Sequence, residues 1–276
     1  MFLGNNKLIS SFKRLSDENS LFHAYLFTGE KNIGKFSFAK SLGNYLENGV
    51  FDLPAENRVL SETLIIGKEE KEVISIDQVR EIRRFLSEKP LRSRKRLVII
   101  DDTETLSDQA GNALLKILEE PPETSLLILL SRSPEAVIRT VRSRTQTVYF
   151  SKVPKKDIAA WLEKEKGIDK DTAKKLAEMS YGKPGLAIKM HGEEKEIYSL
   201  AESFLKNPAK RSGIIRGILD DGVGVPEFLE ALILLLRSKK DVESFHALRA
   251  VTETMTRIMD YNLNKRLQLE TMSASM

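Results

Sequence analysis

The chain has 276 residues, of which 41% are apolar and 30% charged, and this composition is typical of a globular protein with one large domain and one or two smaller ones. It contains no cysteine, which excludes disulfide bonds, cysteine-ligated zinc, iron–sulfur clusters and thiol nucleophiles. The formal net charge of +4 permits contact with nucleic acid without arguing for it, and no apolar run approaches the roughly 20 residues that cross a bilayer, so we expect a cytoplasmic protein without membrane contact.

The first 150 residues alternate short apolar segments with segments of helical periodicity. Strands are predicted at residues 25–27, 64–66, 97–100, 126–130 and 147–150. Helices are predicted between them, at residues 36–46, 76–86, 109–118 and 137–141. The strand segments are mostly continuous apolar runs, which is typical of parallel strands buried on both faces. The pattern predicts an α/β domain with a parallel sheet between two layers of helices.

After residue 150 the sequence predicts only helices. They are expected at 154–162, from a cap at Asp169 or Asp171 to about 180, at 184–190, at 194–205, and from 211 onward with an interruption at 221–224. We therefore divide the chain into an α/β domain at 1–150, a small helical domain at 151–206 and an all-helical C-terminal domain at 207–276.

A phosphate-binding loop is predicted between the first strand and the helix that follows it. Gly29, Gly34 and Lys35 have the spacing of a Walker A loop, in which backbone amides surround phosphate oxygens and the lysine adds a positive charge. At the last position of the motif, Phe36 replaces the Ser or Thr whose hydroxyl holds Mg²⁺. The pattern predicts a damaged nucleotide site. A Gly-rich turn kept only for its backbone geometry is the alternative.

The strand predicted at 97–100 ends in Asp101 and Asp102, which is the Walker B pattern of four apolar residues followed by an acid. Asp101 is placed to hold Mg²⁺, directly or through water. We assign both aspartates to the predicted nucleotide site. The alternative is a strand that ends in two solvent-facing acids.

Four segments of the sequence resemble the bacterial clamp-loader subunits of the AAA+ superfamily. They are His23–Gly29, Ile74–Ile82, Asn112–Pro122 and Thr140–Thr145. Among clamp-loader subunits, the sequence is most similar to the delta prime subunits of DNA polymerase III, over residues 1–190. The resemblance implies a RecA-like P-loop α/β domain, a small helical lid and an all-α C-terminal collar through which subunits assemble.

The resemblance also assigns a role to Arg144. Family members of this type carry a Ser-Arg-Cys motif whose arginine projects into the ATP site of the next subunit, and Ser143-Arg144-Thr145 stands at that position. Such an arginine finger stabilises charge on the transferring phosphoryl group, and its planar fork fits phosphate better than lysine does. Ser143 would cap or orient the loop. Without the resemblance, Arg144 belongs with Arg139 and Arg142 to a solvated basic face.

Other positions depart from the pattern of an active clamp-loader ATPase. Asp102 replaces the glutamate that polarises the attacking water, and a misplacement of about 1 Å costs about 10²-fold in rate. Gly185 replaces the lid arginine that senses the γ-phosphate. Ser131 either fills the other sensor position or simply ends a strand. The zinc-binding cysteines that the family often carries are missing, so we expect no zinc, no required cofactor and at most weak ATP binding.

Together with an intact Arg144 and a damaged nucleotide site, the resemblance implies a non-catalytic subunit of a DNA polymerase holoenzyme, without ATPase activity of its own. The resemblance implies a ring with the delta and gamma/tau subunits that places the sliding clamp on primed DNA. We expect indirect contact with the clamp. We expect DNA to be contacted only through backbone phosphates, because no aromatic residues interleave with the basic run at 89–96. For this run itself, subunit docking and a solvated loop are the alternatives to phosphate contact. The alternatives are a gamma/tau-type ATPase and a module that only binds nucleic acid.

Overall fold

The computed structural model describes residues 3–55, 58–68, 73–192, 194–220, 224–239, 241–261 and 263–276. They pack into two compact units, which we describe separately. The first unit extends to residue 174 and includes 181–185, and the second comprises 175–180 and 186–276. The domain boundaries predicted at residues 150 and 206 stay predictions. Within the described ranges, no helix has both the length and the apolar character that a membrane span needs.

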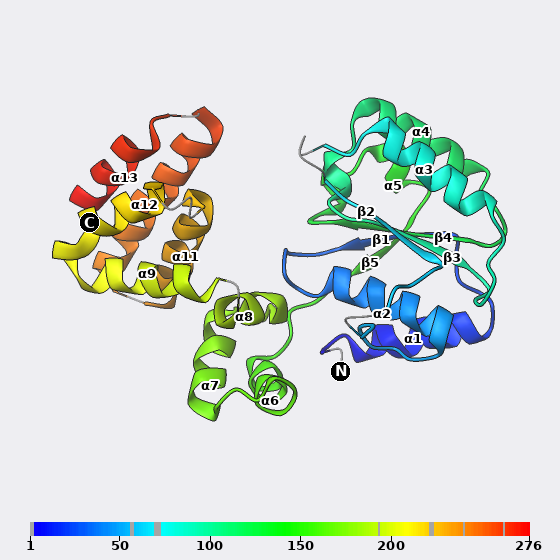
Figure 1. The fold of residues 1–276 in the computed structure, drawn as a ribbon, viewed down its shortest axis with the longest axis horizontal. Coiled ribbons are helices and arrows are strands. Elements are labelled where there is room, and N and C mark those ends of the chain that lie inside the picture. Colours follow the sequence, from blue (N-terminus) through cyan, green and yellow to red (C-terminus); the bar gives the residue numbers. More distant parts are fainter. Residues whose placement is uncertain are drawn as a thin grey trace. The chain divides into compact units, whose positions relative to one another are not determined.

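The first unit is built on a parallel β-sheet whose strands lie in the order β2-β3-β4-β1-β5 (Figure 1). The strands are β1 (Ala24–Thr28), β2 (Thr63–Ile66), β3 (Arg96–Ile100), β4 (Ser125–Ser131) and β5 (Gln146–Tyr149). Leu26 of β1 lies beside Leu129 of β4 on one side and beside Thr147 of β5 on the other. The five predicted strands and their parallel arrangement are confirmed.

Helices cover both faces of this sheet (Figure 1). On one face lie α1 (Asn6–Asp17) and α2 (Lys35–Asn48), and on the other α3 (Ile76–Ser87), α4 (Asp108–Glu119) and α5 (Arg139–Arg142). Successive strand residues point to opposite faces, so β3 sends Leu97 and Ile99 towards α2 and sends Val98 and Ile100 towards α3 and α4. Each helical layer therefore closes its own apolar core against the sheet.

Local sequence signals determine where several helices begin and end. At the start of α3, the Gln78 amide donates to the Ser75 hydroxyl and the Ser75 amide donates to the Gln78 side chain, which forms a capping box. The Ser107 hydroxyl accepts from the Ala110 amide at the start of α4. Helix α2 ends at Gly49, whose φ of 74° favours glycine.

Helices follow the sheet for the rest of the chain. They are α6 (Lys155–Lys166), α7 (Lys170–Met179), α8 (Pro184–His191), α9 (Lys195–Lys206), α10 (Arg211–Asp220), α11 (Val225–Ser238), α12 (Val242–Tyr261) and α13 (Lys265–Ala274). Helix α6 belongs to the first unit, and α9 to α13 belong to the second. The helical C-terminal region predicted from the sequence is confirmed.

The second unit has an apolar core between α9, α10, α11, α12 and α13. The rings of Phe204 in α9 and Phe228 in α11 meet edge to face at 5.5 Å. Arg211, at the start of α10, donates to the carbonyls of Phe204 and of Ser273 in α13, and its guanidinium lies 5.3 Å from the Phe204 ring centroid. One arginine thus joins three helices of this unit.

A buried carboxylate fixes the loop that precedes β3. Glu62 is only 2% exposed, and its carboxylate accepts hydrogen bonds from the backbone amides of Leu91, Arg92 and Ser93. Burial by itself raises the pKa of Glu62, but the hydrogen bonds from Ser93, Arg92 and Leu91 together bring it below its ordinary value. The charged form of Glu62 therefore anchors this turn.

Arg96 does not share the exposure of the basic run in which the sequence places it. Its side chain is 9% exposed, pairs with Glu88 at 2.8 Å, donates to the Phe85 carbonyl and lies 4.5 Å from the Phe85 ring centroid. Its role is to hold the start of β3 against α3. The basic run that faces solvent is limited to residues 89–95.

Replacing Glu62 with glutamine is expected to lower the free energy of unfolding by about 1.5–3 kcal/mol, because three backbone amides lose a charged acceptor. The full difference in free energy of unfolding between the wild type and Glu62→Gln should be present above the ordinary pKa of glutamate. It should disappear as the pH falls through the lower folded-state pKa, where the wild-type carboxylate is itself protonated. Urea unfolding from neutral to acidic pH measures this. Glu81→Gln, exposed on α3, is the control and should have no effect. A pH-independent loss for Glu62→Gln would contradict the anchoring role.

Candidate functional site

The predicted phosphate loop connects β1 to α2, as the motif requires. Gly29, Asn32 and Gly34 have φ angles of 148°, 64° and 107°, so both glycines stand where the backbone disfavours a side chain. A Cβ on Gly29 would also lie 3.0 Å from the carbonyl oxygen of Phe150, which follows β5. The loop has kept the backbone path of a phosphate-binding turn.

Lys35, the first residue of α2, folds back into this loop. Its ammonium donates to the carbonyl oxygens of Gly29 at 2.6 Å and Glu30 at 3.0 Å. Burial lowers the pKa of Lys35, and the carboxylates of Asp101 and Glu104 oppose that shift. The structure therefore brings the predicted lysine and the predicted Asp101 together at the carboxyl ends of β1 and β3.

The two aspartates that follow β3 have different surroundings. Burial raises the pKa of Asp101, and the neighbouring charge of Asp102 raises it further. Asp102 has a φ of 51°, and its carboxylate pairs with Lys68, just beyond β2, at 3.5 Å. The carboxylate predicted to stand where a glutamate activates water is thus engaged by a lysine.

The groups around the loop do not fit a bound Mg²⁺. Magnesium takes oxygen ligands, and Phe36 supplies none. The Phe36 ring instead packs against the core under α1 and α2, with the ammonium of Lys40 at 5.7 Å from its centroid. In the part of the chain that the structure describes, no group of three or more His, Asp or Glu side chains is placed to hold a metal ion.

Ser131 is the last residue of β4 and so lies, like the phosphate loop, at the carboxyl ends of the strands. Its hydroxyl donates to the carbonyl of Ser133 at 2.9 Å. Its neighbour Arg132 faces Glu104, with Nε 3.7 Å from Oε1. Both carboxylate oxygens of Glu104 are buried and accept no hydrogen bond from any described residue. An ion pair that the sequence did not predict therefore lies beside the phosphate loop.

Residues 181–185 and the segment after β5 fasten the loop. Glu30 pairs with Lys152 at 2.6 Å and with Lys183 at 3.4 Å, and the hydrogen bond from Lys152 holds the pKa of Glu30 below its ordinary value. The Gly185 amide donates to the Asn32 carbonyl at 3.0 Å, and a Cβ at Gly185 would lie 2.9 Å from that oxygen. An arginine at position 185 would require the backbone to move.

Arg144 lies in the turn between α5 and β5, with its side chain 37% exposed. Its Nη2 pairs with Oε1 of Glu119 at 2.7 Å. Its Nη1 donates to the Thr140 carbonyl at 3.0 Å and to the Ser143 hydroxyl at 3.3 Å. The Ser143 hydroxyl donates in turn to the Thr140 carbonyl. Ser143 therefore contacts the guanidinium directly.

The sheet separates Arg144 from the phosphate loop of its own chain. In the register of β1 and β5, Tyr25 lies beside Gln146 and Thr28 lies beside Tyr149. Arg144 precedes these paired residues, whereas Gly29 follows them. Arg144 therefore lies at the amino ends of the strands and Gly29 at their carboxyl ends. Six residue steps along a parallel strand correspond to about 20 Å, which an arginine side chain cannot bridge.

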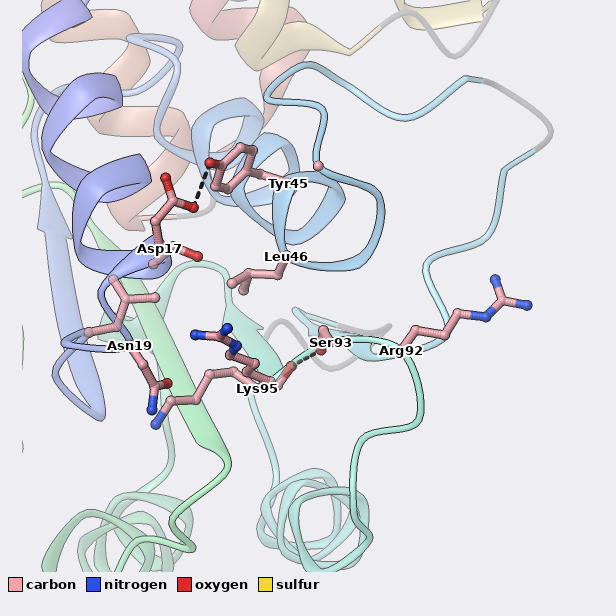
Figure 2. Close-up of a pocket in the computed structure, with 11 residues that line it drawn as sticks. Asp17, Asn19, Tyr45, Leu46, Arg92, Ser93 and Lys95 are labelled. Carbon is pink, nitrogen blue, oxygen red and sulfur yellow. Dashed lines mark hydrogen bonds between the residues drawn. The ribbon is translucent and has the colours of Figure 1, made fainter.

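A cavity of about 390 Å³ lies near the amino end of β3 (Figure 2). It is lined by the C-terminal ends of α1 and α2 and by the basic segment 92–95. Tyr45 donates to Asp17 at 2.8 Å, Lys95 donates to the Glu123 carbonyl, and Arg92 extends away from Asp17 and Tyr45. We assign no ligand to this cavity.

Comparison with known proteins decides the family. The sequence profile described as DNA polymerase III, delta subunit, matches residues 4–154, which is more than half of the chain. The chain belongs to this family. The matched part of this DNA polymerase III delta-subunit family member holds the whole sheet, the phosphate loop and Arg144. The resemblance to clamp-loader subunits predicted from the sequence is confirmed.

Curated relatives of this family member include several DNA polymerase III subunits. The delta′ subunit from Escherichia coli is 35% identical over 118 residues, covering 43% of this chain and 35% of its own. The gamma/tau subunit from Mycobacterium tuberculosis is 34% identical over 158 residues, covering 53% of this chain and 27% of its own. The gamma subunit from a Buchnera aphidicola strain is 24% identical over 271 residues, covering 85% and 74%. The chain thus spans about a third of the delta′ relative's length.

Solved structures extend the likeness to nearly the whole chain. A DNA polymerase III gamma-subunit-related protein from Thermotoga maritima has a TM-score of 0.68 at 25% identity and covers 96% of this chain and 97% of its own. The RuvB Holliday junction branch migration motor of the same organism has a TM-score of 0.53 at 15% identity, covering 99% and 82%. At this identity the likeness to RuvB concerns the fold alone.

Two of the predicted site residues are engaged by side chains that no sequence pattern indicates. Lys68 pairs with Asp102, and Glu119 pairs with Arg144. Glu119 lies in the Glu-Glu-Pro-Pro run that supports the resemblance, but that motif gave it no partner. Neither pair has a sequence signal, because its members are far apart in the chain and meet only at an edge of the folded sheet.

Gly185→Ala is expected to lower the free energy of unfolding by about 1–3 kcal/mol, because its Cβ would press against the Asn32 carbonyl. Gly213→Ala in α10 is the matched control, since a Cβ there meets nothing within 4 Å. The control should be as stable as the wild type or more stable by up to about 1 kcal/mol. Urea unfolding of the three proteins makes the comparison. An unchanged Gly185→Ala protein would show that position 185 does not press on the loop.

Proposed function

We propose that this chain is a delta prime-type subunit of the bacterial clamp loader, which does not hydrolyse ATP itself and offers Arg144 to the ATP site of a neighbouring subunit. Family membership, the damaged phosphate loop and the exposed guanidinium support this proposal. The observation that carries it is the placement of Arg144 at the amino ends of the strands, whereas the phosphate loop of the same chain lies at their carboxyl ends. A guanidinium in that position serves phosphate only on another chain.

At the neighbour's site the guanidinium acts through its charge and shape. During hydrolysis, a water oxygen bonds to the γ-phosphorus while the bond to the bridging oxygen of ADP breaks, and negative charge spreads over the transferring phosphoryl oxygens. The planar fork of Arg144 donates parallel N–H bonds to those oxygens. The ATP, its metal ion and the attacking water belong to the neighbour, and this chain supplies a positioned positive charge.

The proposed partners are the delta and gamma/tau subunits, in a ring that places the sliding clamp on primed DNA. DNA contact would use backbone phosphates and weaken with salt. The exposed cations of residues 89–95 are candidates for that contact. The loop with Gly29, Gly34 and Lys35 would bind ATP weakly at most, and the chain would need neither zinc nor another cofactor.

A gamma/tau-type ATPase is the second candidate function. The Buchnera gamma subunit aligns with 85% of the chain, and the gamma-related structure aligns with 96%. Three features argue against it: the missing hydroxyl at Phe36, the ion pair of Asp102 with Lys68, and the contact at Gly185 that leaves no room for a sensing arginine. Magnesium-dependent ATP hydrolysis by the isolated chain, abolished by Lys35→Ala, would favour this candidate.

Reconstitution with the delta and gamma/tau subunits tests the proposal. Arg144→Ala is expected to slow ATP hydrolysis by about 10³–10⁵-fold at the site that the arginine serves. Arg144→Lys should restore only part of the rate, because an ammonium lacks the bidentate fork. Arg139→Ala, exposed on α5, is the matched control and should hydrolyse ATP at the wild-type rate. Unchanged turnover with Arg144→Ala would refute the assignment.

A further inference from the structure

The guanidinium of Arg144 is held by an acidic side chain of its own chain. Glu119 is the last residue of α4, and its Oε1 lies 2.7 Å from Nη2 of Arg144. The two side chains are 50% and 37% exposed, so the pair lies at the surface. Helix α4 is fixed from beneath by Leu114, Ile117 and Leu118, which are buried against the sheet. The backbone that carries Glu119 is therefore fixed against the sheet.

The other contacts of Arg144 complete this arrangement. The Thr140 carbonyl and the Ser143 hydroxyl both accept from Nη1. A guanidinium carries five N–H groups. The contacts of Arg144 with Thr140, Ser143 and Glu119 engage at most three of them. At least two N–H groups therefore remain for a phosphate. Because the side chain is already held in one orientation, it loses less conformational freedom when it meets a ligand.

Glu119 and Arg144 line two different hollows of the surface. The neighbours of Glu119 are the residues of a groove between α3 and α4 that includes Arg80, Arg83 and Lys116. Arg144 instead lines a separate shallow pocket of about 450 Å³ with Phe22, His23, Leu118, Ser143, Thr145 and Gln146. A phosphate can therefore reach Arg144 from that pocket without displacing the carboxylate.

We propose that Glu119 is a positioning residue for the arginine finger: its carboxylate holds the Arg144 guanidinium in the orientation in which it meets a phosphate of the neighbouring subunit. This inference rests on the proposed function. Glu119 itself touches neither the nucleotide nor the reacting atoms. An exposed ion pair is a weak interaction, so its removal disorders the finger without abolishing its action.

The test uses the reconstituted clamp loader. Glu119→Gln is expected to lower kcat for ATP hydrolysis about twofold to fivefold at the site that Arg144 serves. The KM for ATP should stay unchanged, because the neighbour binds the nucleotide. In the Arg144→Ala background, Glu119→Gln should have no further effect, since no guanidinium remains to be positioned. This double-mutant cycle separates positioning from a structural role, which would lower turnover in both backgrounds.

Glu120→Gln changes the exposed neighbour in the same Glu-Glu-Pro-Pro run and should keep the wild-type kcat. Glu119→Asp keeps the charge with a shorter reach and should fall between wild type and Glu119→Gln. Thermal unfolding of the isolated chain should be the same for all these variants. A wild-type kcat for Glu119→Gln, a raised kcat, or an equal loss with and without Arg144 would overturn the inference. If Arg144→Ala leaves turnover unchanged, the proposed function fails and this inference fails with it.

Discussion

The parallel direction of the sheet fixes the position of every functional group in the first unit. The carboxyl ends of β1, β3 and β4 carry the phosphate loop, the aspartate pair and Ser131. The amino ends carry the basic segment before β3 and Arg144 before β5. Ligands of open parallel sheets bind at the carboxyl ends, so the amino end is remote from a site on the same chain. In the role that we propose for it, Arg144 at the amino end acts only when another chain brings its nucleotide there.

The same sheet explains how the phosphate loop can keep its shape whether or not it keeps the chemistry of a nucleotide site. The loop path depends on glycines at positive φ and on the helix that follows, and both are preserved. The chemistry that the resemblance predicts would need a hydroxyl at position 36, a free carboxylate at position 102 and a lid cation at position 185. The chain has Phe36, an Asp102 paired with Lys68, and Gly185 at these positions. Backbone geometry and reactive groups are separate requirements, so one can persist after the other is lost.

Much of this fold follows from the sequence, because apolar periodicity reports which faces are buried. Helix α1 was missed, although Leu8, Phe12 and Leu15 recur at helical spacing, and its start at Asn5 lacks a side-chain cap. A site residue such as Lys35 is predictable from the sequence, because a motif places it close to its neighbours in the chain. The partners of site residues are not predictable where folding brings distant residues together.

Sequence patterns also do not show whether a side chain is exposed or which partner it bonds to. Arg96 belongs by sequence to a basic run, but the ring of Phe85 and the carboxylate of Glu88 bury it. Ser131 stands where a sensor is expected, but its hydroxyl bonds to the Ser133 carbonyl. Both outcomes depend on which partner lies nearest in the folded chain, and a linear pattern does not contain that information.

The ammonium of Lys35 and the amide of Gly185 donate hydrogen bonds to carbonyl oxygens of the phosphate loop from within the chain. A folded protein gains stability from a ligand only to the extent that it binds that ligand. We therefore expect the shape of this chain to stay the same whether the cell is rich or poor in ATP. In the proposed assembly, such a subunit would give nucleotide-driven neighbours a fixed reference against which to move.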